Sequence, residues 1–135
     1  QAVSLGLRTE GTAVYSLSDS AFGETVFAAR KLGTKYAVYV SDEIRLMRSD
    51  RIELARSEER KVEQAFNRGE LGGEKNAPLI NAEAASALYI NELKSRISAP
   101  VRAKITLKTD SLPEAVLFSN TVSNLHVQSH IHMRR

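Results

Sequence analysis

Three histidines are the side chains whose type and spacing first suggest chemistry. His126, His130 and His132 all fall in the last ten residues, at even positions. On a β-strand, residues two apart share a face, so the Cα atoms of His130 and His132 would lie about 6.5 Å apart. Two imidazoles at that separation can reach one metal ion, whereas His126 would lie about 13 Å from His130.

A metal site at His130 and His132 therefore needs a third ligand from elsewhere in the chain, such as a carboxylate. The sequence offers no cysteine for this purpose and no His-Glu-x-x-His motif. The alternative hypothesis is a polar outer face near the chain end. The same imidazoles would then make that face sensitive to pH, because histidine titrates near neutrality.

A second group of polar residues alternates along residues 101–108 and continues in the last segment. Val101, Ala103, Ile105 and Leu107 alternate with basic or polar residues, which is typical of a strand with one buried face. If this strand shares a sheet with residues 125–133, their polar sides form one basic surface. That surface predicts binding to RNA or another polyanion. The residues assigned to it are Arg102, Lys104, Lys108, His130 and Arg134. Because no aromatic residue interleaves the basic positions, an ordinary solvated face is the alternative.

Other candidate motifs favour structural roles. The charged stretch of residues 50–68 brings like charges together as often as opposite ones, which indicates a solvated helix or a partner-binding helix. The glycine-rich residues 69–75 lack the Gly-Lys-Ser/Thr ending of a P-loop and carry two glutamates, so they are interpreted as a linker. Carboxylate pairs at Asp19 with Glu24, and at Asp42 with Glu43, fall where helices are expected to start. No serine lies in Gly-x-Ser-x-Gly, and an enzyme is not the favoured interpretation.

Composition narrows the function classes. The chain has 135 residues, a 42% apolar share, a formal charge of +3 and no cysteine. Disulfides, thiol catalysis and cysteine-ligated metals are excluded. A charge this small does not by itself drive tight binding to nucleic acid. No apolar run approaches the roughly 20 residues that span a bilayer, and no cofactor is predicted. The first residue is Gln, which predicts a processed or excised N-terminus, and the compartment stays open.

The elements that must position these residues follow from periodicity. Residues 3–7 and 13–17 alternate and predict an N-terminal hairpin. Residues 22–31 predict a helix that ends at Gly33, and residues 36–40 predict a strand. Residues 41–68 leave two hypotheses: one long charged helix, or a hairpin of residues 44–46 and 52–54 turning near Ser49 and Asp50. Residues after Ala55 are helical in both.

The second half of the chain follows a flexible loop expected near residues 69–80. Asn81 is expected to cap a helix that Pro100 prevents from continuing. Strands are predicted at residues 101–108, 116–118 and 125–133. The predicted fold is therefore a single α+β domain over residues 1–135, with a mainly antiparallel sheet packed by two to three helices.

Residues 81–108 combine an alanine-rich helix, an Ala-Pro step and a basic amphipathic strand. This order resembles modules of phage tail-tip and baseplate proteins. The resemblance covers about a fifth of the chain, lacks the Gly-Asp that often follows in such modules, and implies an assembly role. The sequence thus predicts a non-enzymatic assembly domain that binds other subunits or copies of itself. An RNA- or polyanion-binding module is the alternative, and a small metal-dependent enzyme is the third hypothesis.

Overall fold

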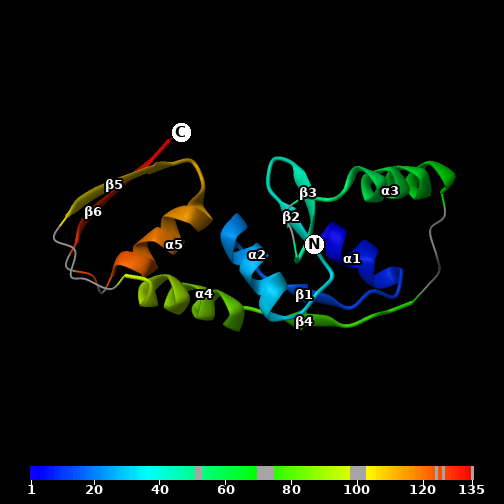
Figure 1. Cartoon of the computed structure of the whole chain (residues 1–135), viewed down its shortest axis with the longest axis horizontal. Coiled ribbons are helices and arrows are strands. Elements are labelled where there is room, and N and C mark those ends of the chain that lie inside the picture. The colour runs from blue at the N-terminus through cyan, green and yellow to red at the C-terminus, as the bar shows by residue number, and fades with distance from the viewer. Residues whose placement is uncertain (51–52, 70–74, 98–102, 124, 126, 135) are drawn as a thin grey trace.

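A computed structural model describes residues 1–50, 53–69, 75–97, 103–123, 125 and 127–134 (Figure 1). Helices and strands alternate along these residues without forming one large sheet. In chain order the elements are α1 (Ala2–Thr9), β1 (Val14–Ser16), α2 (Phe22–Lys31), β2 (Tyr36–Val40), β3 (Ile44–Arg48), α3 (Arg56–Arg68), β4 (Leu79–Asn81), α4 (Ala84–Ser95), β5 (Lys104–Thr109), α5 (Leu112–Val122) and β6 (Gln128–Met133).

The fold is α+β, but the prediction of a mainly antiparallel sheet is wrong. The strands form three separate two-stranded sheets. The β2–β3 pair is antiparallel, whereas the β1–β4 and β5–β6 pairs are parallel. Parallel neighbours need a long crossover. The β1–β4 crossover contains α2 and α3, which the sequence predicts, and the β5–β6 crossover contains α5, which it does not.

The predicted N-terminal hairpin is also wrong, because residues 2–9 form α1. Val3 and Leu7 belong to the alternating series that predicts a strand. They are also four residues apart, and residues at that spacing share one face of a helix. Leu5 lies outside that face and is 60% exposed. β1 then pairs with β4, and Arg8 joins this pairing by donating from Nε to the Ala77 carbonyl at 2.7 Å. Because residues 79–81 form β4, the expected loop near 69–80 ends before them.

Helices α2 and α3 confirm the helical predictions for residues 22–31 and after Ala55, and both begin in the same way. In each, the glutamate three residues after the N-cap position accepts the N-cap amide. Glu24 Oε2 accepts from Ala21 N at 2.7 Å, and Glu58 Oε2 accepts from Ala55 N at 3.1 Å. The carboxylate also lies at the positive end of the helix dipole. Ser18, Asp19 and Ser20 are candidate N-caps by residue type, but the N-cap position of α2 is Ala21.

Neither hypothesis for residues 41–68 matches the structure. β3 forms a hairpin with the preceding strand β2, in the register Val38↔Leu46, and residues 41–43 connect them, so this hairpin turns before Ile44 and not near Ser49 and Asp50. In the expected second strand, Ile52 lies outside the described residues and Leu54 is not in a strand. The strand predicted at residues 36–40 is confirmed.

The strand predicted at residues 116–118 is wrong, because these residues lie in α5. Ser111 accepts the Glu114 amide at its Oγ at 3.3 Å, and Pro113 occupies the first turn. Ala115 and Val122 are buried on one side of this helix. The segment β5–α5–β6 is therefore a parallel β-α-β unit. Strands are confirmed at residues 104–108 and 128–133, and α4 confirms a helix after Asn81.

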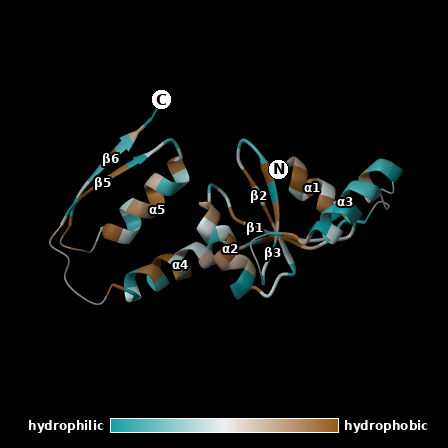
Figure 2. Ribbon diagram, turned by 45° about the horizontal axis from the view of Figure 1, so that its top comes forward, coloured by the Kyte–Doolittle hydropathy of each residue, from teal (hydrophilic) through white to brown (hydrophobic). Residues whose placement is uncertain are grey.

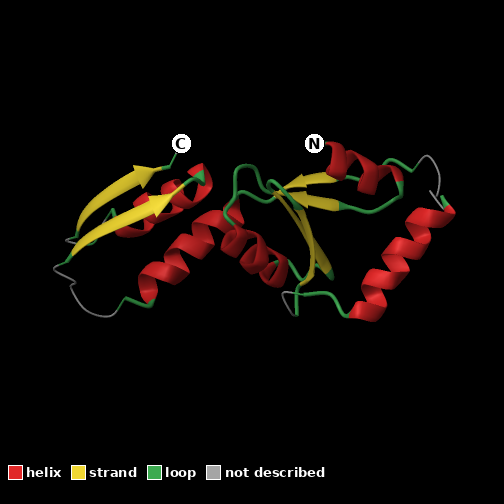
Figure 3. Cartoon of the chain, turned by 90° about the horizontal axis from the view of Figure 1, so that it is seen from above, coloured by secondary structure: helices red, strands yellow, loops and turns green. Residues whose placement is uncertain are grey.

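The molecule is elongated, with α3 at one end and the β5–α5–β6 unit at the other (Figures 1 and 3). Helices α2 and α4 pack together between them, where the Phe27 and Tyr89 rings lie 5.2 Å apart. Among the described residues the buried apolar side chains are mostly alanines, and Met47 and Val122 are the larger ones. No described helix has the length and apolar character needed to span a bilayer.

Candidate functional site

Strands β5 and β6 lie side by side and align the predicted basic residues. The parallel register places Lys104 opposite Gln128, Thr106 opposite His130 and Lys108 opposite His132. All six side chains are exposed. Because alternate residues of a strand share a face, these even-numbered positions form one surface, called here the basic face. The prediction that the two strands share a sheet is confirmed, although they run parallel.

Helix α5 covers the opposite side of the same two strands. Thr109, the buried last residue of β5, donates from Oγ1 to Glu114 Oε2 of α5 at 2.9 Å. This bond places the odd-numbered side of β5 against α5, and Ile105 and Leu107 on that side are half-buried. The basic face is consequently the outer side of a β-α-β unit. Because its side chains are polar, this side of the sheet can face water.

The cationic groups of this region have no carboxylate partner in the described part of the chain. Lys104, Lys108, His130, His132 and Arg134 take part in no ion pair or side-chain hydrogen bond there. Arginines elsewhere are held differently. Arg48 binds Asp50 and Glu58, each at 2.8–2.9 Å, and Arg96 binds Glu92 at 3.0 Å. The hydrogen bonds that Arg48 donates, first to Asp50 and then to Glu58, raise the pKa of Arg48 further above its usual range.

The metal site predicted at His130 and His132 has no third ligand among the described residues. His130 and His132 share the basic face, but no group of three or more histidine, aspartate or glutamate side chains that could hold a metal comes together in residues that the structure describes. Arg102, His126 and Arg135 lie outside those residues, as do the loop glycines Gly72 and Gly73.

The predicted carboxylate pairs have structural partners. Glu24 is buried and binds the Ala21 amide, and Glu43 accepts from Arg45 Nε at 2.7 Å. Glu83, which the sequence analysis did not single out, accepts from the Ser18 hydroxyl and, at 2.9 Å, from the Ser18 amide. These two bonds lower the pKa of Glu83, the hydroxyl contributing more.

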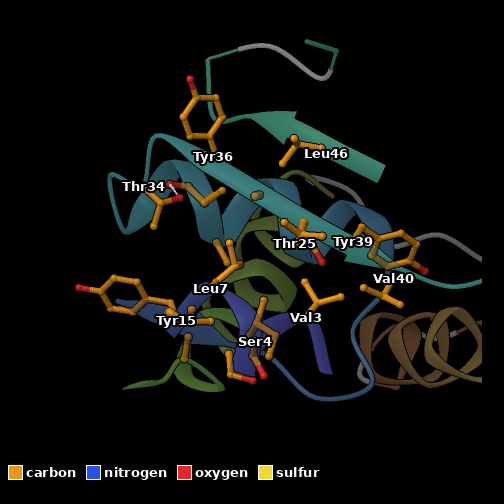
Figure 4. Close-up of a pocket in the computed structure, with 18 of the residues that line it drawn as sticks. Val3, Ser4, Leu7, Tyr15, Thr25, Thr34, Tyr36, Tyr39, Val40 and Leu46 are labelled. Carbon is orange, nitrogen blue, oxygen red and sulfur yellow. Dashed lines mark hydrogen bonds between the residues drawn. The ribbon is translucent and has the colours of Figure 1, made fainter. Parts of the chain in front are cut away.

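A second feature, which the sequence analysis missed, is a large hollow between α1, α2, the β2–β3 hairpin and the start of α3. Its volume is about 1160 Å³. Val3 and Leu7 of α1, Thr25 of α2 and Val40 of β2 lie around it, while the rings of Tyr15 and Tyr36 point outward (Figure 4). Sequence periodicity identifies apolar residues but not whether their neighbours close over them, so no sequence signal predicts this space.

Helix α3 borders the hollow with Glu58, Lys61 and Val62. It is largely hydrophilic (Figure 2) and packs closely against no other described element. Two apolar side chains on one side of it, Val62 and Phe66, are 51% and 83% exposed. Apart from Glu58, every residue of α3 is exposed, as expected for a solvated helix, and the partner-binding alternative stays a prediction.

Comparison with protein-family models, characterised proteins and solved structures finds no match. The resemblance of residues 81–108 to phage tail-tip and baseplate modules therefore has no support from these comparisons.

Proposed function

We propose that this chain is a non-enzymatic assembly domain that completes its core by packing against further protein subunits, the first of them a second copy of itself. The observation that carries the proposal is the surface area. The chain exposes 10046 Å², whereas a compact monomer of its mass exposes about 7000 Å². The surplus of about 3000 Å² exceeds the roughly 800 Å² per partner that a stable interface buries.

The exposed surface includes side chains that normally supply a core. Ile44 is 64% exposed, Leu112 66% and Phe66 83%. Single exposed apolar residues are ordinary, but a chain whose buried apolar residues are mostly alanines gains little from burial within the monomer. Subunit contact would remove the larger side chains from water and supply the missing stabilisation.

The small sheets supply a second attachment device. Every described strand has one partner strand, so each of the three sheets has two open edges. An open edge presents unpaired amides and carbonyls that pair readily with a strand of another chain. We favour a second copy as the first partner because most soluble assemblies are symmetric homo-oligomers.

Sedimentation velocity over a range of protein concentrations tests this proposal. The chain is expected to sediment as a dimer or larger species that dissociates on dilution. Phe66→Ser is expected to raise the dissociation constant at least about thirtyfold, because buried interface aromatics contribute about 2 kcal/mol or more. Gln64→Ser, at an exposed position on the opposite side of the same helix, is the matched control and is expected to sediment like the parent.

A monomer at every concentration, with no partner retained on purification under mild conditions, would contradict the proposal. So would equal effects of Phe66→Ser and Gln64→Ser on the dissociation constant. Far-ultraviolet circular dichroism of both variants checks that the monomer fold is retained.

A further inference from the structure

The basic face has a charge pattern that assembly does not explain. Lys104 and Lys108 stand on β5, and His130 and His132 stand beside them on β6. By the rise of a β-strand, Lys104 and Lys108 are about 13 Å apart and the two histidines about 6.6 Å apart. The face therefore carries two parallel rows of cationic or protonatable groups and no carboxylate.

The carboxylates nearest in the chain do not neutralise these rows. Glu114 of α5 lies on the opposite side of the sheet, where it accepts the Thr109 hydroxyl. Asp110 follows the end of β5 and makes no ion pair with Lys108 or His132 among the described contacts. Arg134 follows β6 directly, and its backbone amide bonds the Thr109 carbonyl at 2.9 Å. Its guanidinium thus adds a further positive charge at the same end of the sheet.

This surface matches a flexible chain of phosphates better than other anions. Lysine and arginine rows follow a phosphate backbone irrespective of sequence, and each cation that neutralises a phosphate releases a counterion. The face is exposed, two strands wide and without aromatic rings, so it offers contact to the backbone and no stacking of bases. A single strand can bend along such a row, whereas a rigid duplex holds its phosphates at the rims of grooves about 12 Å and 6 Å wide.

We propose that the basic face binds the phosphate backbone of single-stranded nucleic acid. Lys104, Lys108 and Arg134 supply three cations, and His130 and His132 stand beside the lysines, where each can donate a ring N–H to a phosphate oxygen. The site is separate from α3, so its failure leaves the assembly proposal intact.

Binding of a short oligouridylate, labelled with a fluorescent dye, is measured by fluorescence anisotropy at several salt concentrations. Three neutralised phosphates give a slope of log K against log salt of about −2, which is the slope expected for the parent chain. A slope near zero would overturn the proposal.

A double variant and a matched control assign the effect to this face. Lys104→Gln with Lys108→Gln is expected to reduce the slope by about 1.4. Arg56→Gln with Arg60→Gln removes the same charge from exposed positions of α3 and is expected to bind like the parent.

Equal weakening by the α3 variant would show attraction by net charge alone and overturn the proposal. Two further probes test the ligand class. Tighter binding of a matched duplex, or of polyglutamate, than of oligouridylate would overturn the assignment to a single-stranded nucleic acid.

Discussion

Polar side chains connect segments that lie far apart in the sequence of this molecule. Arg8 joins the end of α1 to residues 76–77, through Nη2 to Asn76 Oδ1 at 3.0 Å and Nε to the Ala77 carbonyl. Glu83 joins the start of α4 to Ser18. Because large apolar side chains contribute little burial here, these hydrogen bonds are expected to matter more than such bonds do in a well-packed domain.

The bond between Glu83 and Ser18 makes a prediction about pH. The pKa of Glu83 lies below its ordinary value of 4.5 in the folded chain, first because the Ser18 hydroxyl donates to it and then because the amide does. A carboxyl group with a depressed folded-state pKa stabilises the fold above its unfolded-state pKa, and this contribution is lost as the pH falls through the folded-state pKa. Urea unfolding from neutral to acid pH is therefore expected to show a steeper loss of stability in the parent than in Glu83→Gln.

The size of this effect is modest, because Glu83 is accessible to water and its interaction is screened. Asp110→Asn serves as the control, since Asp110 is an exposed carboxylate at the surface with no ion pair among the described contacts. Identical pH profiles for the parent and Glu83→Gln would show that the Ser18 bond does not form in solution.

At the scale of elements, short capping devices decide where helices begin. The N-cap residue of α2 and of α3 is an alanine, whose amide donates to a glutamate three residues later. The N-cap residue of α5 is Ser111. Ser111 and Glu114 form the Ser-x-x-Glu signature that marks a helix start, followed by an apolar run. α5 then determines that β6 returns parallel to β5, so one serine cap influences the direction of a strand pair.

Ser111→Ala is expected to destabilise the chain by about 1 kcal/mol, the usual cost of losing an N-cap side chain. Denaturant unfolding followed by circular dichroism measures this change. Ser123→Ala is the matched control, because Ser123 lies at the other end of α5 and its hydroxyl donates to the Asn120 carbonyl at an exposed position. A loss of stability in the control as large as in Ser111→Ala would contradict the role of the cap.

At the scale of the whole molecule, the elongated shape accompanies a core in which few large apolar side chains are buried among the described residues. The two ends of the molecule, α3 and the β5–α5–β6 unit, are joined through α2 and α4 (Figure 1). A hollow of about 1160 Å³ opens between the elements of the first half (Figure 4). A shape of this kind leaves much apolar surface in water. The assembly proposed above would cover this apolar surface. The free energy of unfolding would then depend on the protein concentration.

The midpoint of thermal unfolding is therefore expected to rise with protein concentration, because association stabilises the folded chain by mass action. Differential scanning fluorimetry across a hundredfold concentration range measures this shift, which is expected to be smaller in Phe66→Ser. A midpoint independent of concentration in the parent would indicate a self-sufficient monomer.

Local pattern in the sequence determined several elements by itself. The helical spacing of Phe22, Val26 and Ala29 and the stop at Gly33, whose φ is +66°, predicted α2 correctly. The alternation of residues 104–108 and 128–133 predicted β5, β6 and their polar outer side. These signals succeed because they depend on residues within a turn or two of one another.

Only the tertiary structure decided which strands pair, in which direction, and how much surface is left uncovered. Val3, Leu5 and Leu7 alternate, yet Val3 and Leu7 also fit one face of a helix, and neighbouring elements select between the two. Residues 116–118 suit a strand by composition, but the cap at Ser111 and the burial of Ala115 and Val122 make them helical. Pairing and packing depend on residues distant in the chain, so periodicity could predict the basic residues of the face but not the parallel β-α-β unit that presents them.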